Sequence, residues 1–188
     1  MSVSERPMVI PSTALAQQGQ GAALMLGHSG PKKHLIFTLN GEVYAIAIDQ
    51  IREIIGFRSP TIVPMMPSYL RGIINLRGMV VPVLDLAYRF GLAPNPVGKR
   101  TCIIILELPL HPDMPEQHYM VGLVVDMVNA VLDISPSMIE LAPSFGVSIR
   151  PEFLHGMARI KEKFILLLNL QRVVALDELN ALRSISDK

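Results

Sequence analysis

The side chains best suited to chemistry in this sequence surround one loop. His111 and His118 flank residues 109–117, with Asp113 and Glu116 between them. Imidazole and carboxylate groups are common transition-metal ligands, so the loop is a candidate metal site. The spacing fits no familiar ligand pattern, and a solvated loop tip is the better interpretation. We expect no bound metal or cofactor, and a small metal-binding β-barrel protein is kept as a remote alternative.

Three aspartates and one cysteine are the other residues to weigh for catalysis. Asp49, Asp85 and Asp126 each follow an expected strand and precede a short helical turn, and helix capping explains this placement better than acid–base chemistry. Cys102 stands alone in an apolar run, as a buried structural thiol does. The sequence contains no phosphate-cradling glycine motif and no nucleophile elbow. We therefore predict that the protein is not an enzyme.

The composition favours protein partners. Half of the residues are apolar and only 18% are charged, so some apolar side chains are expected on the surface as contact area. A net charge of +1 and the absence of Trp argue against nucleic-acid binding. No apolar run is long enough for a membrane helix, and Glu5, Pro7 and Pro11 do not fit a secretion signal. The expected location is the cytoplasm.

The elements that must position these residues are mostly short strands. Asn40-Gly41 separates strands expected at 34–39 and 42–48, and Arg77-Gly78 turns a second hairpin over 73–84. Asp49 is expected to cap one or two helical turns, and Ser68 a short helical turn that ends at Gly72. Asp85 is expected to cap a short helix over 86–90, followed by a linker at 93–99.

The order of these elements repeats along the chain. Residues 47–55 share their apolar pattern with residues 124–132, so that Asp49 corresponds to Asp126 at an offset of 77. At an offset of 84, Leu70-Arg-Gly72 corresponds to Leu154-His-Gly156, and Val83-Leu-Asp-Leu86 to Leu167-Leu-Asn-Leu170. Three matched blocks in one order indicate an internal duplication.

The duplication predicts a mainly β fold of two pseudo-repeated, five-stranded small β-barrels with short helices. The expected boundaries are a flexible lead-in over residues 1–32, one barrel over about 34–92 and the second over about 100–174, with a strand or helix possibly exchanged between them. An amphipathic helix is expected from about 175 to 185, within a C-terminal helix and tail that reach residue 188.

The positions of Glu53 and Arg77 hold different residue types in the second copy. Glu53 lies on the polar side of an apolar segment and Arg77 at a hairpin tip, whereas the second copy has Ala130 and Lys161, or its neighbour, at these places. This asymmetry indicates a task specific to the first copy. Two unrelated surface charges are the alternative.

Several motifs make the chain resemble the CheW family. The resemblance covers residues 33 to 178 and is carried by Phe37-x-Leu39, Glu42-Val-Tyr-Ala-Ile-Ala-Ile48, Ile51-x-Glu53-Ile54, Val63-Pro64-x-x-Pro67, Gly72-Ile-Ile-Asn-Leu-Arg-Gly78, Pro82-Val-Leu-Asp85-Leu86, Gly122-Leu-Val-Val-Asp126-x-Val128 and Leu154-x-Gly156.

The resemblance implies two barrels around a shared apolar seam and a non-enzymatic adaptor. Members of this family couple the cytoplasmic tip of methyl-accepting chemoreceptors to the regulatory domain of the histidine kinase CheA. Carried onto matching positions, receptor contact is implied for Ile51, Glu53, Gly72, Arg77 and Val128, with Glu53 and Arg77 acting together.

Kinase contact is implied mainly for the second barrel. Phe145 matches an aromatic residue of the family's ring contact, although neighbouring Glu140 replaces the usual basic residue, and the long loop at 109–117 is a further departure. The family also serves pili, gliding and surface sensing. A coupling protein of such a non-flagellar pathway is therefore the main alternative function.

Overall fold

The computed structural model describes residues 30–111 and 113–175, which from Pro31 onward belong to one compact unit. Strand β1 begins at Lys32. The lead-in expected over 1–32 lies almost wholly outside the described residues, and the helix expected from 175 to 185 lies outside them apart from its first residue. Among the described residues, no helix is long and apolar enough to cross a membrane.

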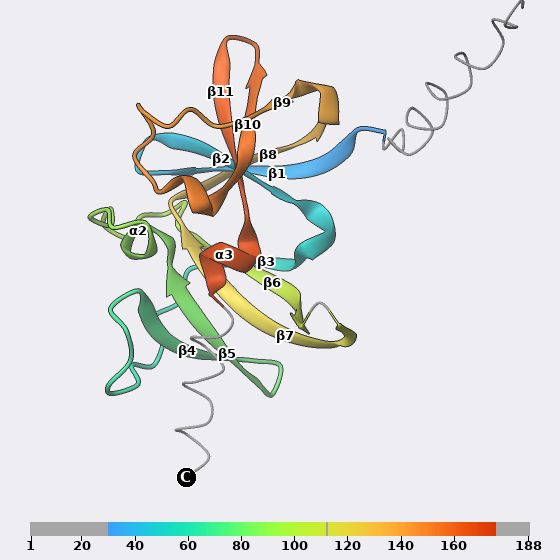
Figure 1. Ribbon diagram of the computed structural model, residues 1–188. Coiled ribbons are helices and arrows are strands. Elements are labelled where there is room, and N and C mark those ends of the chain that lie inside the picture. Colours follow the sequence, from blue (N-terminus) through green and yellow to red (C-terminus); the bar gives the residue numbers. More distant parts are fainter. Residues whose placement is uncertain (1–29, 112, 176–188) are drawn as a thin grey trace, which may run out of the picture. The chain divides into compact units, whose positions relative to one another are not determined.

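The described chain folds into two antiparallel-rich sheets joined by short helical turns (Figure 1). The six-stranded sheet contains, in spatial order, β8 (Met127–Ile134), β1 (Lys32–Leu39), β2 (Glu42–Ala47), β11 (Lys163–Leu168), β10 (Leu154–Ile160) and β9 (Ile139–Glu140). The five-stranded sheet contains β3 (Ile51–Gly56), β6 (Cys102–His111), β7 (Met114–Val125), β5 (Met79–Asp85) and β4 (Leu70–Leu76). The predicted mainly β fold class is confirmed, with the two-residue β9 as an added sixth strand.

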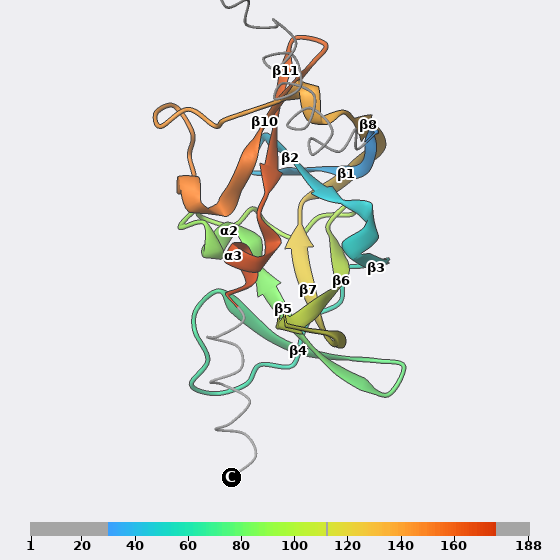
Figure 2. The ribbon, with the colours of Figure 1, turned by 45° about the vertical axis from the view of Figure 1, so that its right-hand side comes forward.

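Five short helices complete the described elements. The 3₁₀ helices are η1 (Ile48–Gln50), η2 (Pro136–Met138) and η3 (Pro151–Phe153), and the α-helices are α2 (Leu86–Arg89) and α3 (Leu170–Val174). Helices α2 and α3 follow equivalent strands and lie side by side (Figures 1 and 2). The Arg89 Nε donates to the Val173 carbonyl oxygen at 2.7 Å and joins the two helices.

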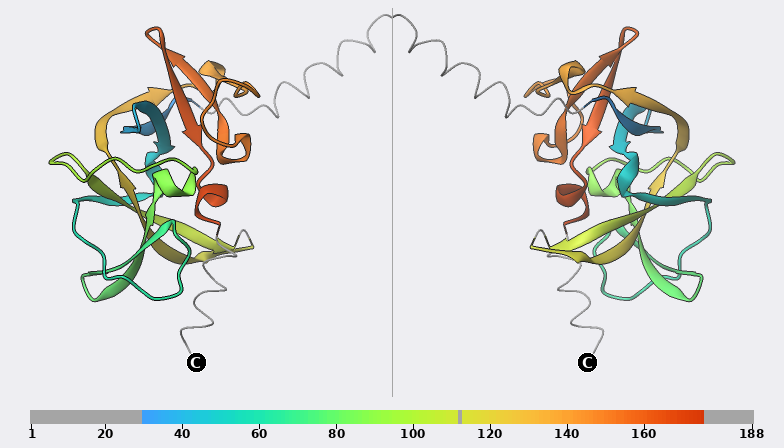
Figure 3. Two further views of the ribbon diagram at one scale, coloured as in Figure 1. Left: turned by 90° about the vertical axis from the view of Figure 1, so that its left-hand side faces the viewer. Right: turned by 90° about the vertical axis from the view of Figure 1, so that its right-hand side faces the viewer.

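The two copies exchange their first hairpins. Hairpin β1–β2 belongs to the first copy by sequence, yet it lies between β8 and β11 of the second copy. Hairpin β6–β7 of the second copy lies between β3 and β5 of the first. Each lobe in Figure 3 therefore combines the strands of one copy, three in the five-stranded sheet and four in the six-stranded sheet, with a hairpin from the other copy.

The duplication extends to irregular backbone features. Arg52 is the extra residue of a β-bulge between β3 and β6, and Asn129, 77 residues later, is the extra residue of a bulge between β8 and β1. The strand pairs β4–β5 and β10–β11 repeat a second bulge, one residue before Gly72 and Gly156. Bulges are defined features of a fold, so their repetition is independent support for the duplicated sequence.

The core has one shared cluster and one smaller cluster in each sheet. The shared cluster takes Phe37 and Tyr44 from one sheet, Leu84 and Leu106 from the other, and Phe153 from η3. The smaller clusters lie in the five-stranded sheet, around Val81 and Ile103, and in the six-stranded sheet, around Ile36 and Ile165. The apolar seam implied by the family resemblance is therefore present between the two sheets.

Two predicted helical turns are wrong. Asp49 lies inside η1, whose N-cap is Ala47, and the residues after it form strand β3 instead. The turn expected after Ser68 is replaced by strand β4 from Leu70. Pairing of these segments with β6 and β5 outweighs their weak helical pattern, because local propensity yields to tertiary packing.

Asp85 behaves as predicted. Its carboxylate accepts from the Tyr88 backbone N–H at 3.2 Å and caps α2, and Asn169 caps α3 in the same way. The Asp85 side chain is only 3% exposed, and its Oδ2 accepts from the Arg71 Nε at 2.7 Å. The second copy keeps the cap without this ion pair, since Asn169 is neutral.

Asp85→Asn is expected to destabilise the fold by about 1–3 kcal/mol, because it keeps the cap but leaves the half-buried Arg71 without its anion. Denaturant unfolding measures the change. Asp85→Ala removes the cap as well and should cost about 1 kcal/mol more. A fully stable Asp85→Asn protein would contradict a stabilising role for the ion pair.

The β10–β11 turn holds two non-glycine residues with left-handed backbone angles, Lys161 (φ 48°) and Glu162 (φ 66°). The equivalent β4–β5 turn uses Arg77-Gly78, and the β1–β2 turn uses Asn40-Gly41. Asn and Gly adopt such angles at lower cost. Lys161→Asn with Glu162→Gly should therefore raise the free energy of unfolding by about 1 kcal/mol. The reverse change, Gly78→Glu in the β4–β5 turn, should lower it by a similar amount, and both are measurable by chemical denaturation.

Candidate functional site

Glu53 and Arg77 form an ion pair on the surface of the five-stranded sheet. Glu53 lies on β3 and Arg77 at the tip of the β4–β5 hairpin, and the Arg77 Nη2 donates to the Glu53 Oε2 at 3.1 Å. Strands β3 and β4 are the two opposite edges of this sheet, so the pair joins edges that curl toward each other. The Arg77 side chain is 73% exposed and that of Glu53 22%. The structure therefore pairs the two side chains and leaves the guanidinium free to contact a partner as well.

Ile51 and Val128 occupy equivalent places in the two sheets. They are 77 residues apart, Ile51 at the start of β3 and Val128 near the start of β8. Both are partly buried and pack against the shared core cluster. The two side chains thus form partly exposed apolar edges of the shared core between the sheets, one from each sheet.

Gly72 has a different character from the other candidate residues. Its φ is +139°, and a Cβ built on it would lie 2.1 Å from the Thr61 carbonyl oxygen. This close approach allows Thr61 and Ile73 to exchange two backbone hydrogen bonds of 2.8 and 2.9 Å. Gly72 therefore shapes the segment before β4, and the structure brings it to Thr61 rather than to the Glu53–Arg77 pair.

Phe145 lies on a separate surface of the copy-two sequence. It is 81% exposed within residues 141–150, between β9 and η3, and Leu141 in the same segment is 90% exposed. Glu140 immediately before them is the last residue of β9. Leu141 escaped sequence reasoning because a single leucine in a loop carries no periodic signal.

Sequence reasoning also missed two equivalent exposed residues on free sheet edges. Ile54 on β3 and Val131 on β8 are both exposed, and they are 77 residues apart like Ile51 and Val128. The alignment of residues 47–55 with 124–132 already pairs them, but it did not show that they face outward, because the first segment was expected to be helical. In the described chain, each of these strands pairs on one side only.

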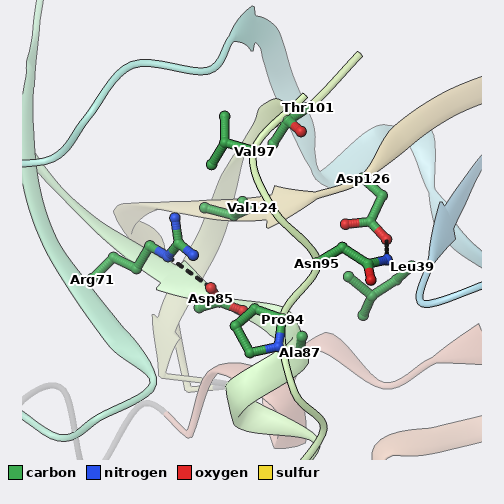
Figure 4. Close-up of a pocket in the computed structure, with 10 residues that line it drawn as sticks. All are labelled: Leu39, Arg71, Asp85, Ala87, Pro94, Asn95, Val97, Thr101, Val124 and Asp126. Atoms are coloured by element: carbon green, nitrogen blue, oxygen red, sulfur yellow. Dashed lines mark hydrogen bonds and ion pairs between the residues drawn. The ribbon is translucent and has the colours of Figure 1, made fainter. Parts of the chain in front are cut away.

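A small pocket in the described part of the chain has polar side chains that bind one another. It lies between the linker after α2 and the ends of β5 and β7, with a cavity volume of about 10 Å³, the lower limit for one water molecule (Figure 4). Its charged and amide groups already bind one another, Arg71 with Asp85 and Asn95 with Asp126.

The candidate metal loop does not gather ligands in the described part of the chain. His111 Nδ1 lies 3.4 Å from the Asp113 carboxylate, and both side chains are exposed. No group of three or more His, Cys, Asp or Glu side chains there could hold an ion. The loop is the end of the long β6–β7 hairpin.

The lone cysteine is a poor nucleophile. Burial raises the pKa of the Cys102 thiol, an effect only partly opposed by a hydrogen bond with the Val128 backbone. Burial also raises the pKa values of Tyr44 and Tyr119, and the Tyr44 hydroxyl donates to Glu42 at 2.9 Å. These groups stay protonated at neutral pH and serve packing.

Comparison with known proteins agrees with this geometry. The CheW-like domain family matches residues 33–178. The chain is 30% identical over 155 residues to the chemotaxis protein CheW of Klebsiella aerogenes, covering 82% of this chain and 89% of that protein. It is 38% identical over 112 residues to the chemotaxis protein CheW of Bacillus subtilis, covering 60% of this chain and 67% of that protein.

A solved structure shares the fold as well. The scaffolding protein TtCheW from Thermoanaerobacter tengcongensis aligns with a TM-score of 0.67 and 34% sequence identity, over 78% of this chain and 90% of that one. The family match over most of the chain, the relatives and the common fold agree on one assignment. The chain belongs to the CheW-like domain family.

Proposed function

We propose that this protein is a non-enzymatic adaptor that couples methyl-accepting chemoreceptors to the histidine kinase CheA in chemotaxis. The observation that carries the proposal is the exposed Glu53–Arg77 ion pair beside the apolar edges Ile51 and Val128, in a chain of the CheW-like family. The pair has no counterpart in the second copy, where Ala130 replaces the acid.

The receptor surface suits one face of a helix. A chemoreceptor tip is a helical hairpin, and a helix binds where an apolar groove accepts its apolar face and charges fix its register. Ile51 and Val128 supply apolar contact from the two sheets, and Arg77 supplies an exposed cation. Gly72 acts on this surface indirectly, through the segment that it packs against.

The kinase surface is assigned to the exposed segment 141–150. Phe145→Ala is expected to weaken binding of the CheA regulatory domain by about 1–2 kcal/mol, because an exposed aromatic anchor loses its contact area. Phe164→Ala, at a half-exposed phenylalanine on β11, is the matched control and should leave the affinity unchanged. Titration calorimetry of both variants measures the difference, and equal losses would remove Phe145 from the kinase surface.

An adaptor of this kind works without turnover. It changes kinase output only by favouring one kinase state over another, and several weak contacts add up through high effective concentration in an array. We infer that the protein acts in the cytoplasm and reaches the membrane through its receptors. A deletion strain assigns the pathway: loss of swimming chemotaxis supports the flagellar role, and loss of pilus or gliding behaviour alone supports the alternative.

Binding of the two partners tests the proposal. Labelled full-length protein is titrated with a chemoreceptor tip fragment and, separately, with the CheA regulatory domain; saturable binding to both is expected, with no nucleotide hydrolysis by the protein alone. Binding to neither would overturn the adaptor role. Stoichiometric metal in the purified protein, lost on changing His111 and His118 to alanine, would support the metal-binding alternative instead.

A further inference from the structure

A single residue carries the chain from one sheet to the other after β7. Strand β7 ends at Val125 in the five-stranded sheet, and β8 begins at Met127 in the six-stranded sheet. Asp126 stands between them, two residues before Val128. Whatever fixes Asp126 also fixes the start of β8.

Asp126 binds segments from both sides of this crossing. Its Oδ2 accepts from the Asn40 backbone N–H at 2.8 Å and from the Asn95 Nδ2 at 2.7 Å, and its own N–H donates to the Thr38 carbonyl at 3.2 Å. The Asn40 Nδ2 donates to the Ala93 carbonyl oxygen at 2.8 Å. The carboxylate therefore joins the β1–β2 turn, the crossing and the linker after α2. Figure 4 shows its bond with Asn95.

The equivalent residue in the first copy makes no such connection. Asp49 lies 77 residues before Asp126 and is exposed in η1, where no side-chain bond caps the helix. Its side chain has no hydrogen bond or ion pair among the described contacts. The same residue type is thus kept at both crossings but is bonded at only one, the one next to Val128.

We propose that Asp126 is a positioning residue for the receptor surface: it anchors the β7–β8 crossing and thereby holds Val128 in place relative to Ile51. The proposal rests on the proposed adaptor function. Both bonds of the Asp126 carboxylate are made within the chain, to Asn40 and Asn95, so we infer that it acts through Val128 rather than by touching a partner.

The local contacts explain why Val128 would respond. Val128 pairs with Phe37 directly beside the bulge at Asn129, where the ladder between β8 and β1 is interrupted. Apart from the pairing of Met127 and Val128 with β1 and the packing of Val128 on the core, the crossing has two weak sulfur contacts. They are an Arg100 contact with the Met127 sulfur at 3.1 Å and the Cys102 thiol at the Val128 backbone. Removing the carboxylate frees the Asn40 N–H and the Asn95 amide together, and a charge-assisted bond is stronger than either of these sulfur contacts.

Three full-length variants test the proposal. Asp126→Ala removes the acceptor, Asp126→Asn retains one side-chain oxygen that can accept from Asn40, and Asp49→Ala is the matched control. Each is titrated with a chemoreceptor tip fragment at a temperature where it is fully folded, and the methyl NMR signals of Val128 and Ile51 are recorded without the fragment.

Asp126→Ala is expected to bind the receptor fragment roughly three- to thirtyfold more weakly and to shift the Val128 methyl signals. Asp126→Asn should retain part of the receptor affinity and shift the Val128 methyl signals less. Asp49→Ala should change neither the receptor affinity nor the Val128 signals. An aspartate that only stabilises the fold would lower the melting temperature and leave the dissociation constant of the folded protein unchanged, which would overturn the proposal.

The proposed function can fail separately. If the wild-type protein does not bind the receptor fragment, the adaptor role fails, and the methyl signals still decide whether Asp126 positions Val128. Unshifted Val128 signals in Asp126→Ala would overturn the positioning role even if receptor binding is strong.

Discussion

Gly72→Ala is expected to destabilise the protein by about 3–5 kcal/mol, the largest effect of any single change considered for this chain. The added Cβ would lie 2.1 Å from the Thr61 carbonyl oxygen and 2.7 Å from its carbon, both of them backbone atoms that no rotamer can move. The residue's φ of +139° adds strain for any side chain. The segment before β4 must shift, and the two hydrogen bonds between Thr61 and Ile73 are lost.

Chemical denaturation of two control variants isolates the cause. Gly56→Ala, on edge strand β3 with open space around the added carbon, should change the stability by less than about 1 kcal/mol. Gly156→Ala, the equivalent in the second copy, meets the Glu140 carbonyl oxygen at 2.6 Å and should be costly too. If Gly72→Ala were as stable as Gly56→Ala, the close approach to Thr61 would not constrain the fold.

The same result bears on binding. If Gly72→Ala also loses receptor affinity, the loss follows from the displaced segment 57–69, because glycine has no side chain to offer a partner. Folded protein must therefore be quantified before a dissociation constant is assigned to the variant.

Arg77→Glu is expected to weaken receptor binding by about 1–3 kcal/mol, roughly five- to 150-fold, while leaving the fold intact. The pair with Glu53 is exposed, so its loss should change stability by less than about 1 kcal/mol. The reversed charge removes the exposed cation and places two acids at the rim. Kinase binding should change much less, because Phe145 lies on a different surface.

Two further variants sharpen this measurement. Lys161→Glu reverses the charge of the equivalent hairpin tip in the second copy and should leave receptor affinity unchanged. Glu53→Arg combined with Arg77→Glu restores an ion pair in the opposite order; a partial recovery of affinity would show that the pair acts as a unit. Equal loss of both partners in Arg77→Glu, or an unfolded product, would make Arg77 a structural residue.

Much of the fold could be predicted because its strongest signals are local. Asn40-Gly41 and Arg77-Gly78 are short turns with left-handed backbone angles, and both hairpins form where the sequence placed them. Asp85 precedes a helix whose start needs an acceptor, and it caps that helix. The repeat was visible because bulges and caps need particular residue types.

The wrong predictions concern segments whose structure depends on contacts with residues far away in the sequence. The segment after Asp49 has an apolar spacing that also suits a helix, but β6, far along the chain, pairs with every residue of it except Arg52. At the candidate site, the contact between Glu53 and Arg77 is present as expected. Gly72 was assigned to the same surface from the family resemblance, whereas its steric role depends on Thr61, which no short sequence pattern connects to it.

The exchange of hairpins has a consequence for cooperativity. Because each lobe is completed by strands from the other copy, neither copy can melt while its neighbour stays intact. The two halves should therefore unfold as one thermodynamic unit, with equal calorimetric and van't Hoff enthalpies. A single copy on its own would lack the hairpin that completes its sheet, so the covalent link between the copies supplies what a second chain would otherwise have to provide.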